Sequence, residues 1–187
     1  MKFTIYCGSI SGHHAHFVES TKRLGEYLAK NSIDIVYGGG NVGLMGAMAD
    51  AVLEAGGRVY GVIPEDLKNK EIAHPNLTEL TVVADMHERK ATMANMADGF
   101  VALPGGPGTL EEIFEAWTWA QLGHHSKPCA FYNMNGFYNP LKGMVETMCT
   151  SGFIKPEYAD MLIHVDTPEA LLTAINHYQA PKDKWAK

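Results

Sequence analysis

The sequence predicts an α/β fold with a doubly wound, mostly parallel sheet of about seven strands and with helices on both faces of that sheet. Two observations lead to this prediction. Short β-rich runs alternate with longer helical patterns along the whole chain, which favours parallel pairing through crossover helices. The β-rich runs are apolar throughout instead of alternating with polar residues, which is typical of strands that are buried on both faces.

Each expected element follows from this alternation. The strands are expected at Phe3–Cys7, Ile35–Tyr37, Arg58–Ile63, Leu80–Ala84, Gly99–Leu103, Pro128–Tyr132 and Leu162–Val165. The helices are expected near residues 14–30, 43–56, 86–97, 109–122, 137–151 and 168–178. The pattern shows no internal repeat and no linker, so we expect residues 1–187 to form a single domain with a frayed tail at 181–187.

Length and composition exclude several function classes. The chain has 187 residues and a formal net charge of −6, which makes nucleic acid a poor partner because its phosphates are bound by clustered Lys and Arg. It has no apolar run near the ~18 residues of a membrane span and no signal-peptide pattern. The three cysteines have no metal-type spacing, which favours reduced thiols. We therefore expect a soluble, cytoplasmic protein that does not bind membranes.

Three glycine-rich turns follow predicted strands, at Cys7–Gly12, Gly38–Gly46 and Pro104–Thr109. Ligands of open parallel sheets bind beyond the carboxyl ends of the strands, where these turns lie. Residues 38–43 fit the G-x-G-x-x-G pattern of dinucleotide sites, although they follow the second strand and not the first. A dinucleotide-dependent enzyme is one interpretation of this turn, and close backbone packing is the other.

The turn at Pro104–Thr109 is the strongest candidate for an anion site. Its glycines free the backbone, and the amides at the start of the following helix attract a phosphate or a carboxylate. We expect Thr109 to cap this helix. Glu112 then has two interpretations, as the second member of a capping box with Thr109 or as a chemical group. Trp119 lies almost opposite the apolar stripe that contains Trp117, which indicates a second cover for this helix, either a subunit or a ligand.

Arg89 lies within the methionine stripe of the helix near 86–97, which Asp85 and Glu88 are expected to cap. A guanidinium on an apolar face is either paired, for example at a subunit interface, or directed into a ligand cavity. Lys90 supplies a second cation beside it. The histidine clusters at residues 13–16 and 124–125 match no metal motif, so we expect no metal site.

Two segments together, M-H-E-R-K at 86–90 and P-G-G-P-G-T-L-E-E at 104–112, resemble the LONELY GUY (LOG) family of cytokinin riboside 5′-monophosphate phosphoribohydrolases. The family was once labelled lysine decarboxylase, but no lysine here lies in a recognisable pyridoxal-phosphate setting. The resemblance extends to residues 6–12, 37–46 and 117–123, so it covers nearly the whole chain. Pro107 is a departure, because many members have an aromatic residue there, and it is expected to reshape the edge of the pocket.

The resemblance implies a Rossmann-like homodimer without a cofactor that cleaves the N-glycosidic bond of purine riboside 5′-monophosphates, either N6-modified or plain AMP. It implies that Arg89 and Glu112 are the catalytic pair. The residues that it implies for substrate or phosphate binding are Glu71, Lys90, Gly105, Gly106, Pro107, Gly108, Thr109, Leu110, Glu111 and Thr118. Further nucleotide contacts are expected from the other two glycine turns, at Gly8, Ser9, Gly39, Gly40, Gly43 and Met45.

The chemistry agrees with this assignment. Breaking the C1′–N9 bond builds positive charge on the ribose, which a carboxylate near C1′ can stabilise while it activates water. The alternative is a non-catalytic carrier of a nucleotide or of molybdenum cofactor, since such carriers have similar glycine loops. A carrier has no need for a carboxylate at C1′, so the presence of both Arg89 and Glu112 favours the hydrolase.

Overall fold

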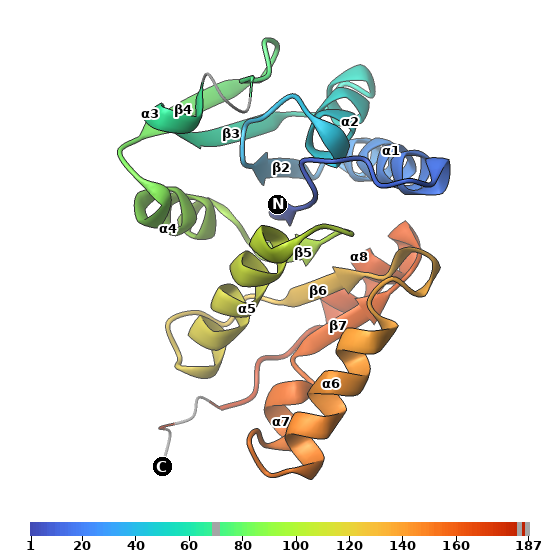
Figure 1. Cartoon of the computed structure of the whole chain (residues 1–187), viewed down its shortest axis with the longest axis vertical. Helices are drawn as coiled ribbons and strands as arrows, with labels where there is room; N and C mark the ends of the chain where they lie inside the picture. Colours follow the sequence, from blue (N-terminus) through green and yellow to red (C-terminus); the bar gives the residue numbers. More distant parts are fainter. Residues whose placement is uncertain (69–71, 183–184, 186–187) are drawn as a thin grey trace.

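The computed structural model describes residues 1–68, 72–182 and 185, and its centre is a sheet of seven parallel strands (Figure 1). The strands are β1 (Lys2–Tyr6), β2 (Asp34–Tyr37), β3 (Val59–Pro64), β4 (Glu79–Val83), β5 (Gly99–Ala102), β6 (Cys129–Tyr132) and β7 (Leu162–Val165). The predicted parallel sheet is confirmed, and each strand boundary lies within one residue of its expected position.

The helices that were expected are also present, with boundaries within two residues of the prediction. They are α1 (Ala15–Lys30), α2 (Gly43–Glu54), α4 (Met86–Met96), α5 (Pro107–Gln121), α6 (Asn139–Thr150) and α8 (Pro168–His177). Three short elements were not predicted, because three or four residues are too few to show a helical period: α3 (Glu65–Lys68), the 3-10 turn η1 (Met134–Gly136) and α7 (Pro156–Ala159).

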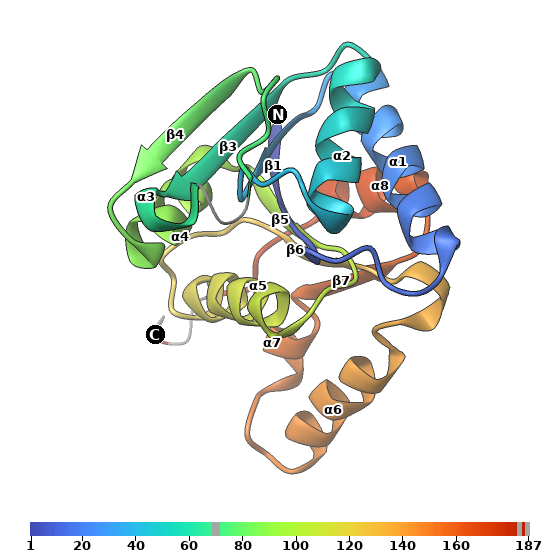
Figure 2. The same cartoon turned by 45° about the horizontal axis from the view of Figure 1, so that its top comes forward.

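Helices cover both faces of the sheet, so the apolar strands are buried on both sides. On one face α1, α2 and α8 pack together and contribute Leu28, Met48 and Leu171 to one core. On the other face Met93 of α4 and Trp117 of α5 belong to a second core, to which α6 and α7 also contribute. Figure 2 shows the two layers, with α6 extending away from the sheet.

The order of strands across the sheet, β4-β3-β2-β1-β5-β6-β7, reverses direction between β1 and β5. The chain leaves β1 toward β2 on one side and later returns to β5 on the other side. At such a switch point the loops after the two strands diverge and leave a crevice for a ligand. Here those loops are the turns that begin at Cys7 and Leu103, and the Gly8 amide donates to the Pro104 carbonyl at 3.1 Å.

The tail that was expected to fray falls partly outside the described residues. Residues 181 and 182 are in neither a helix nor a strand, and Trp185 is exposed. Among the helices that the structure describes, none has both the length and the apolar character needed to cross a membrane. The same described residues contain no group of three or more His, Cys, Asp or Glu side chains arranged to hold a metal ion.

Candidate active site

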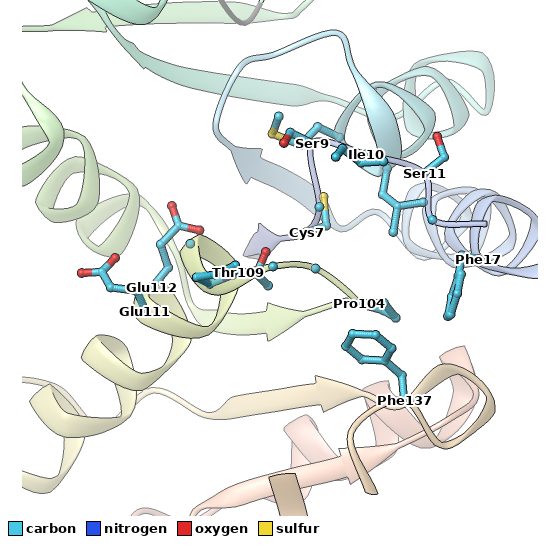
Figure 3. Close-up of a pocket in the computed structure, with 18 of the residues that line it drawn as sticks. Cys7, Ser9, Ile10, Ser11, Phe17, Pro104, Thr109, Glu111, Glu112 and Phe137 are labelled. Atoms are coloured by element: carbon cyan, nitrogen blue, oxygen red, sulfur yellow. The ribbon is translucent and has the colours of Figure 1, made fainter. Parts of the chain in front are cut away.

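A cavity of about 570 Å³ opens at the switch point (Figure 3). The turn at residues 7–12, after β1, forms one wall, and residues 104–109 with Glu111 and Glu112 form another. All three glycine-rich turns therefore contribute to one cavity, as the carboxyl-end rule predicts, the turn at residues 38–46 through Leu44 and Met45. The remaining lining residues are Phe17, Leu67, Met86, Arg89 and Phe137.

The start of α5 differs from the prediction. Thr109 was expected to cap the helix, but the cap residue is Gly106 and the helix begins at Pro107. Proline is favoured at the first helical position because its fixed φ suits the helix and the amide that it lacks would have no helical partner. Thr109 is therefore the third helical residue and is buried. The capping-box interpretation of Glu112 is wrong, since this residue lies three positions beyond Thr109 inside the helix.

The first turn of α5 is suited to an anion. It contains no acidic residue, and Gly106 and Gly108 are exposed at the edge of the cavity. A Cβ at either glycine would meet nothing within 4 Å, so protein packing does not require glycine at these two positions. A Cβ at Gly105, in contrast, would collide with the Thr109 hydroxyl. The bare backbone at 106 and 108 permits a close approach by a ligand to the helix N-terminus.

Glu112 is half-buried on α5 and faces the end of β1. Figure 3 shows its side chain and that of Glu111 pointing in different directions from the helix. Burial raises the pKa of both Tyr6 and Cys7, and the nearby negative charge of Glu112 raises them further. Cys7, which follows β1, and Glu112 both line the cavity, so Glu112 lies near the carboxyl end of β1.

Arg89 lies in the first turn of α4 with only 5% of its surface exposed, and it lines the same cavity. The predicted cap of this helix is confirmed: Asp85 accepts from the Glu88 amide at 2.9 Å. One guanidinium nitrogen of Arg89 donates to the Gly38 carbonyl at 3.1 Å. Arg89 is therefore hydrogen-bonded within the protein and also lines the cavity.

Lys90 has a different environment from its neighbour. Its ammonium group contacts Glu111 Oε1 at 2.6 Å and Glu115 Oε2 at 3.0 Å, and it joins α4 to α5. Burial acts to lower the pKa of Lys90, but the hydrogen bonds that its ammonium group donates to the two carboxylates outweigh this effect, and the pKa is raised. Lys90 is not among the described residues that line the cavity. Glu115 was missed by the sequence analysis, although it follows Glu111 by one helical turn.

The structure brings some of the predicted contacts together and not others. Those that line the cavity are Gly8, Ser9, Met45, Arg89, Gly105, Gly106, Pro107, Gly108, Thr109, Glu111 and Glu112. Those that lie elsewhere in the described part of the chain are Gly39, Gly40, Gly43, Lys90, Leu110 and Thr118. The Thr118 hydroxyl donates to the Phe114 carbonyl at 2.7 Å within its own helix. Glu71 lies outside the described residues.

The G-x-G-x-x-G turn is explained by packing. Gly43 has a φ of +56°, and a Cβ on it would collide with the Ser9 backbone. A Cβ on Gly38 would collide with the Arg89 guanidinium. These contacts require glycine without any dinucleotide, which favours the second interpretation of this turn.

An aromatic pair at the cavity was not predicted. The rings of Phe17 and Phe137 meet edge to face with centroids 5.9 Å apart, and both line the cavity (Figure 3). Phe137 comes shortly after the carboxyl end of β6, so the rule that located the glycine turns also applies to it. Phe17 lies in the first turn of α1. The sequence does not distinguish a phenylalanine that lines a cavity there from one that packs in the core.

Comparison with known proteins agrees with these motifs. The family model described as possible lysine decarboxylase matches residues 45–175. The chain is 43% identical to cytokinin riboside 5′-monophosphate phosphoribohydrolase LOG7 of Arabidopsis thaliana, over 98% of this chain and 84% of that protein. It is 45% identical to the cytokinin riboside 5′-monophosphate phosphoribohydrolase of Rhodococcoides fascians, over 92% of this chain and 87% of that protein.

Solved structures share the fold at low sequence identity. The molybdenum cofactor binding protein from Rippkaea orientalis superposes with a TM-score of 0.70 at 18% identity, over 94% of each chain. At this identity the similarity establishes the α/β architecture alone.

Proposed function

The chain belongs to the LOG family of cytokinin riboside 5′-monophosphate phosphoribohydrolases, and on that premise we propose that it hydrolyses the N-glycosidic bond of purine riboside 5′-monophosphates. The products are the free base and ribose 5-phosphate. The observation that carries the proposal is that a buried arginine and a half-buried glutamate, Arg89 and Glu112, line one cavity with a helix N-terminus.

The 5′-phosphate would bind at the start of α5. The positive end of the helix dipole and the backbone amides at the helix start favour an anion there, and the exposed glycines at 106 and 108 leave room for one. The absence of an acidic residue from this turn avoids repulsion. Phosphate at this position directs the ribose along the helix toward Glu112.

Glu112 would act on the ribose. As the C1′–N9 bond breaks, the bonding electrons leave with the base and positive charge builds on the sugar, which a carboxylate stabilises. A water oxygen forms the new bond to C1′, and Glu112 accepts a proton from that water. The departing base takes up a proton from solvent, which gives the neutral free base. Glu112 lies within α5 and not at its cap, and it lines the cavity together with the start of the helix. Arg89, which lines the same cavity, would hold the phosphate or ribose through its guanidinium.

The carrier of a nucleotide or of molybdenum cofactor is the second candidate function, because such a protein shares the fold at a TM-score of 0.70. The position of Glu112 argues against it. A carrier gains nothing from a carboxylate beside a bound nucleotide, where its charge would oppose that of the phosphate.

Two substitutions test the proposal. Glu112→Gln is expected to keep nucleotide binding and melting temperature but to lower turnover by about 10²–10⁴-fold, the usual size of a general acid–base contribution. Arg89→Ala is expected to lower both turnover and affinity. Glu115→Gln is the matched control, since it removes a carboxylate one turn further along α5 that binds Lys90. Unchanged turnover in Glu112→Gln would refute the catalytic role of that residue.

We further propose a homodimer and a cytoplasmic location. Trp119 is only half-buried on α5, while Trp117 on the same helix is buried, and a second copy of the chain would cover the exposed ring. Light scattering coupled to gel filtration tests this assembly, and a monomer mass would contradict it. The three free cysteines support a reducing compartment.

A further inference from the structure

We propose that His74, held by Asp50, is a positioning residue that fixes the Gly38–Asn41 turn and through it the guanidinium of Arg89. The proposal rests on the proposed function, in which Arg89 contacts the substrate. It is carried by a chain of hydrogen bonds that runs from α2 to Arg89. His74 lies outside the set of residues that line the cavity, so any effect that it has on catalysis must act through another residue.

The His74 ring is buried and bonded through both nitrogens. Its Nδ1 accepts from the Asn76 amide at 3.2 Å, so the proton of the neutral ring is on Nε2. Nε2 then donates to Asp50 Oδ1 on α2 at 3.0 Å. The His74 side chain is 2% exposed, whereas Asp50 is 53% exposed. The aspartate is an anchor on the surface helix, and the histidine ties the segment after α3 to it.

This segment is paired with the glycine turn that follows β2. The His74 amide donates to the Gly39 carbonyl at 2.9 Å, and the Asn41 amide donates to the Ile72 carbonyl at 2.9 Å. Gly40 and Ala73 form an antiparallel bridge between these two bonds. The backbone of the turn is therefore held on one side by the segment that His74 anchors.

The other side of the turn holds Arg89. The Gly38 carbonyl accepts from the Arg89 guanidinium at 3.1 Å, in a buried environment. The guanidinium packs so closely on Gly38 that a Cβ there would collide with it. A shift of the turn would therefore move both the hydrogen-bond acceptor and the surface against which Arg89 packs. An error of about 1 Å in the position of a catalytic group can cost roughly 10²-fold in rate.

A double-mutant cycle with Arg89 tests this inference. His74→Ala is expected to lower kcat/KM on N6-isopentenyl-AMP about tenfold in the wild-type background, but less than about twofold in the Arg89→Ala background. If turnover of the double variant is too slow to measure, the affinity of the four proteins for AMP, measured by calorimetry, replaces kcat/KM in the cycle. Asp50→Asn, which keeps an acceptor for Nε2, is expected to retain activity, and Asp50→Ala to lower it.

A matched control separates positioning from general loss of stability. Val145→Ala removes buried methyl groups from α6 in the second core, and it is expected to lower the melting temperature without changing kcat/KM. If His74→Ala does not fold, Asp50→Ala replaces it, because Asp50 is exposed on the helix surface. Hydrogen exchange is expected to rise at the Asn41 and His74 amides in either variant.

The failures of the two proposals are distinguishable. Equal effects of His74→Ala in both backgrounds, or a lower melting temperature with unchanged kcat/KM, would overturn the positioning role and leave the proposed function intact. A wild-type protein that neither binds nor hydrolyses the nucleotides would overturn the proposed function, and the positioning role of His74 with it.

Discussion

Replacement of Lys90 by methionine distinguishes a structural role from a ligand contact. The ammonium group lies between Glu111 and Glu115 at 2.6 and 3.0 Å, and the Lys90 side chain is 11% exposed. Exposed ion pairs contribute about 0.2–1 kcal/mol. Glu111 is 55% exposed and falls near the low end of this range, whereas Glu115 is 28% exposed and falls near the high end. The two pairs together are expected to contribute about 1.2 kcal/mol.

This contribution can be measured as a change in melting temperature. For a chain of this size each kcal/mol corresponds to about 2–4 °C, so Lys90→Met is expected to lower the melting temperature by about 2–5 °C. The control is Lys30→Met, which removes an exposed pair with Glu26 at 3.5 Å on α1 and is expected to cost about 1 °C. High salt should abolish the change in melting temperature caused by Lys30→Met. The change caused by Lys90→Met should fall by a smaller fraction, because its ion pairs are less exposed.

The contribution of Lys90 to folding stability is expected to decrease at high pH. Because the folded-state pKa of Lys90 is raised, its stabilising contribution is complete below pH 10.5 and is lost as the pH rises through the folded-state value. The difference between wild type and Lys90→Met should therefore be constant at neutral pH and disappear in strongly alkaline solution. An unchanged melting temperature combined with weaker nucleotide binding would refute this reasoning and make Lys90 a ligand contact, as the family resemblance implies.

Further substitutions test the packing of the site and of the fold. Gly108→Ala is expected to keep the melting temperature but weaken ribose 5-phosphate binding roughly tenfold, while Gly105→Ala lowers the melting temperature itself; equal melting temperatures would contradict this. Burial lowers the pKa of His164, so its stabilising effect is lost as the pH falls below 6.5. His164→Phe should flatten the loss of stability in acid, and an unchanged slope would exclude this cause. Trp117→Phe removes the 2.8 Å bond from Nε1 to the buried Tyr158 carbonyl and is expected to cost about 1–3 kcal/mol in urea unfolding; a loss below about 0.5 kcal/mol would contradict that expectation.

The fold was predictable because its signals are local. In strands such as β6, Cys-Ala-Phe-Tyr, all four residues are buried and none is charged, which is typical of a parallel sheet covered on both faces. The start of α4 was predictable for the same reason. Asp85 and Glu88 are three residues apart in the sequence and bond to the adjacent backbone.

The site was only partly predictable because its remaining features depend on competition or on distant contacts. Thr109 and Pro107 are both good residues for a helix start, and the proline at the first helical position moved the start two residues earlier than expected. Spacing alone cannot show that Lys90 faces α5 while Arg89 faces the cavity. The His74 contact joins residues 24 positions apart, and no local pattern indicates it.

Incubation of the purified protein with AMP and with N6-isopentenyl-AMP, followed by chromatography of the products, tests the central claim most directly. We predict release of adenine or isopentenyladenine together with an equal amount of ribose 5-phosphate, and the ratio of the two rates gives the base preference. Nucleotide binding without release of base from either substrate would contradict the hydrolase and favour the carrier.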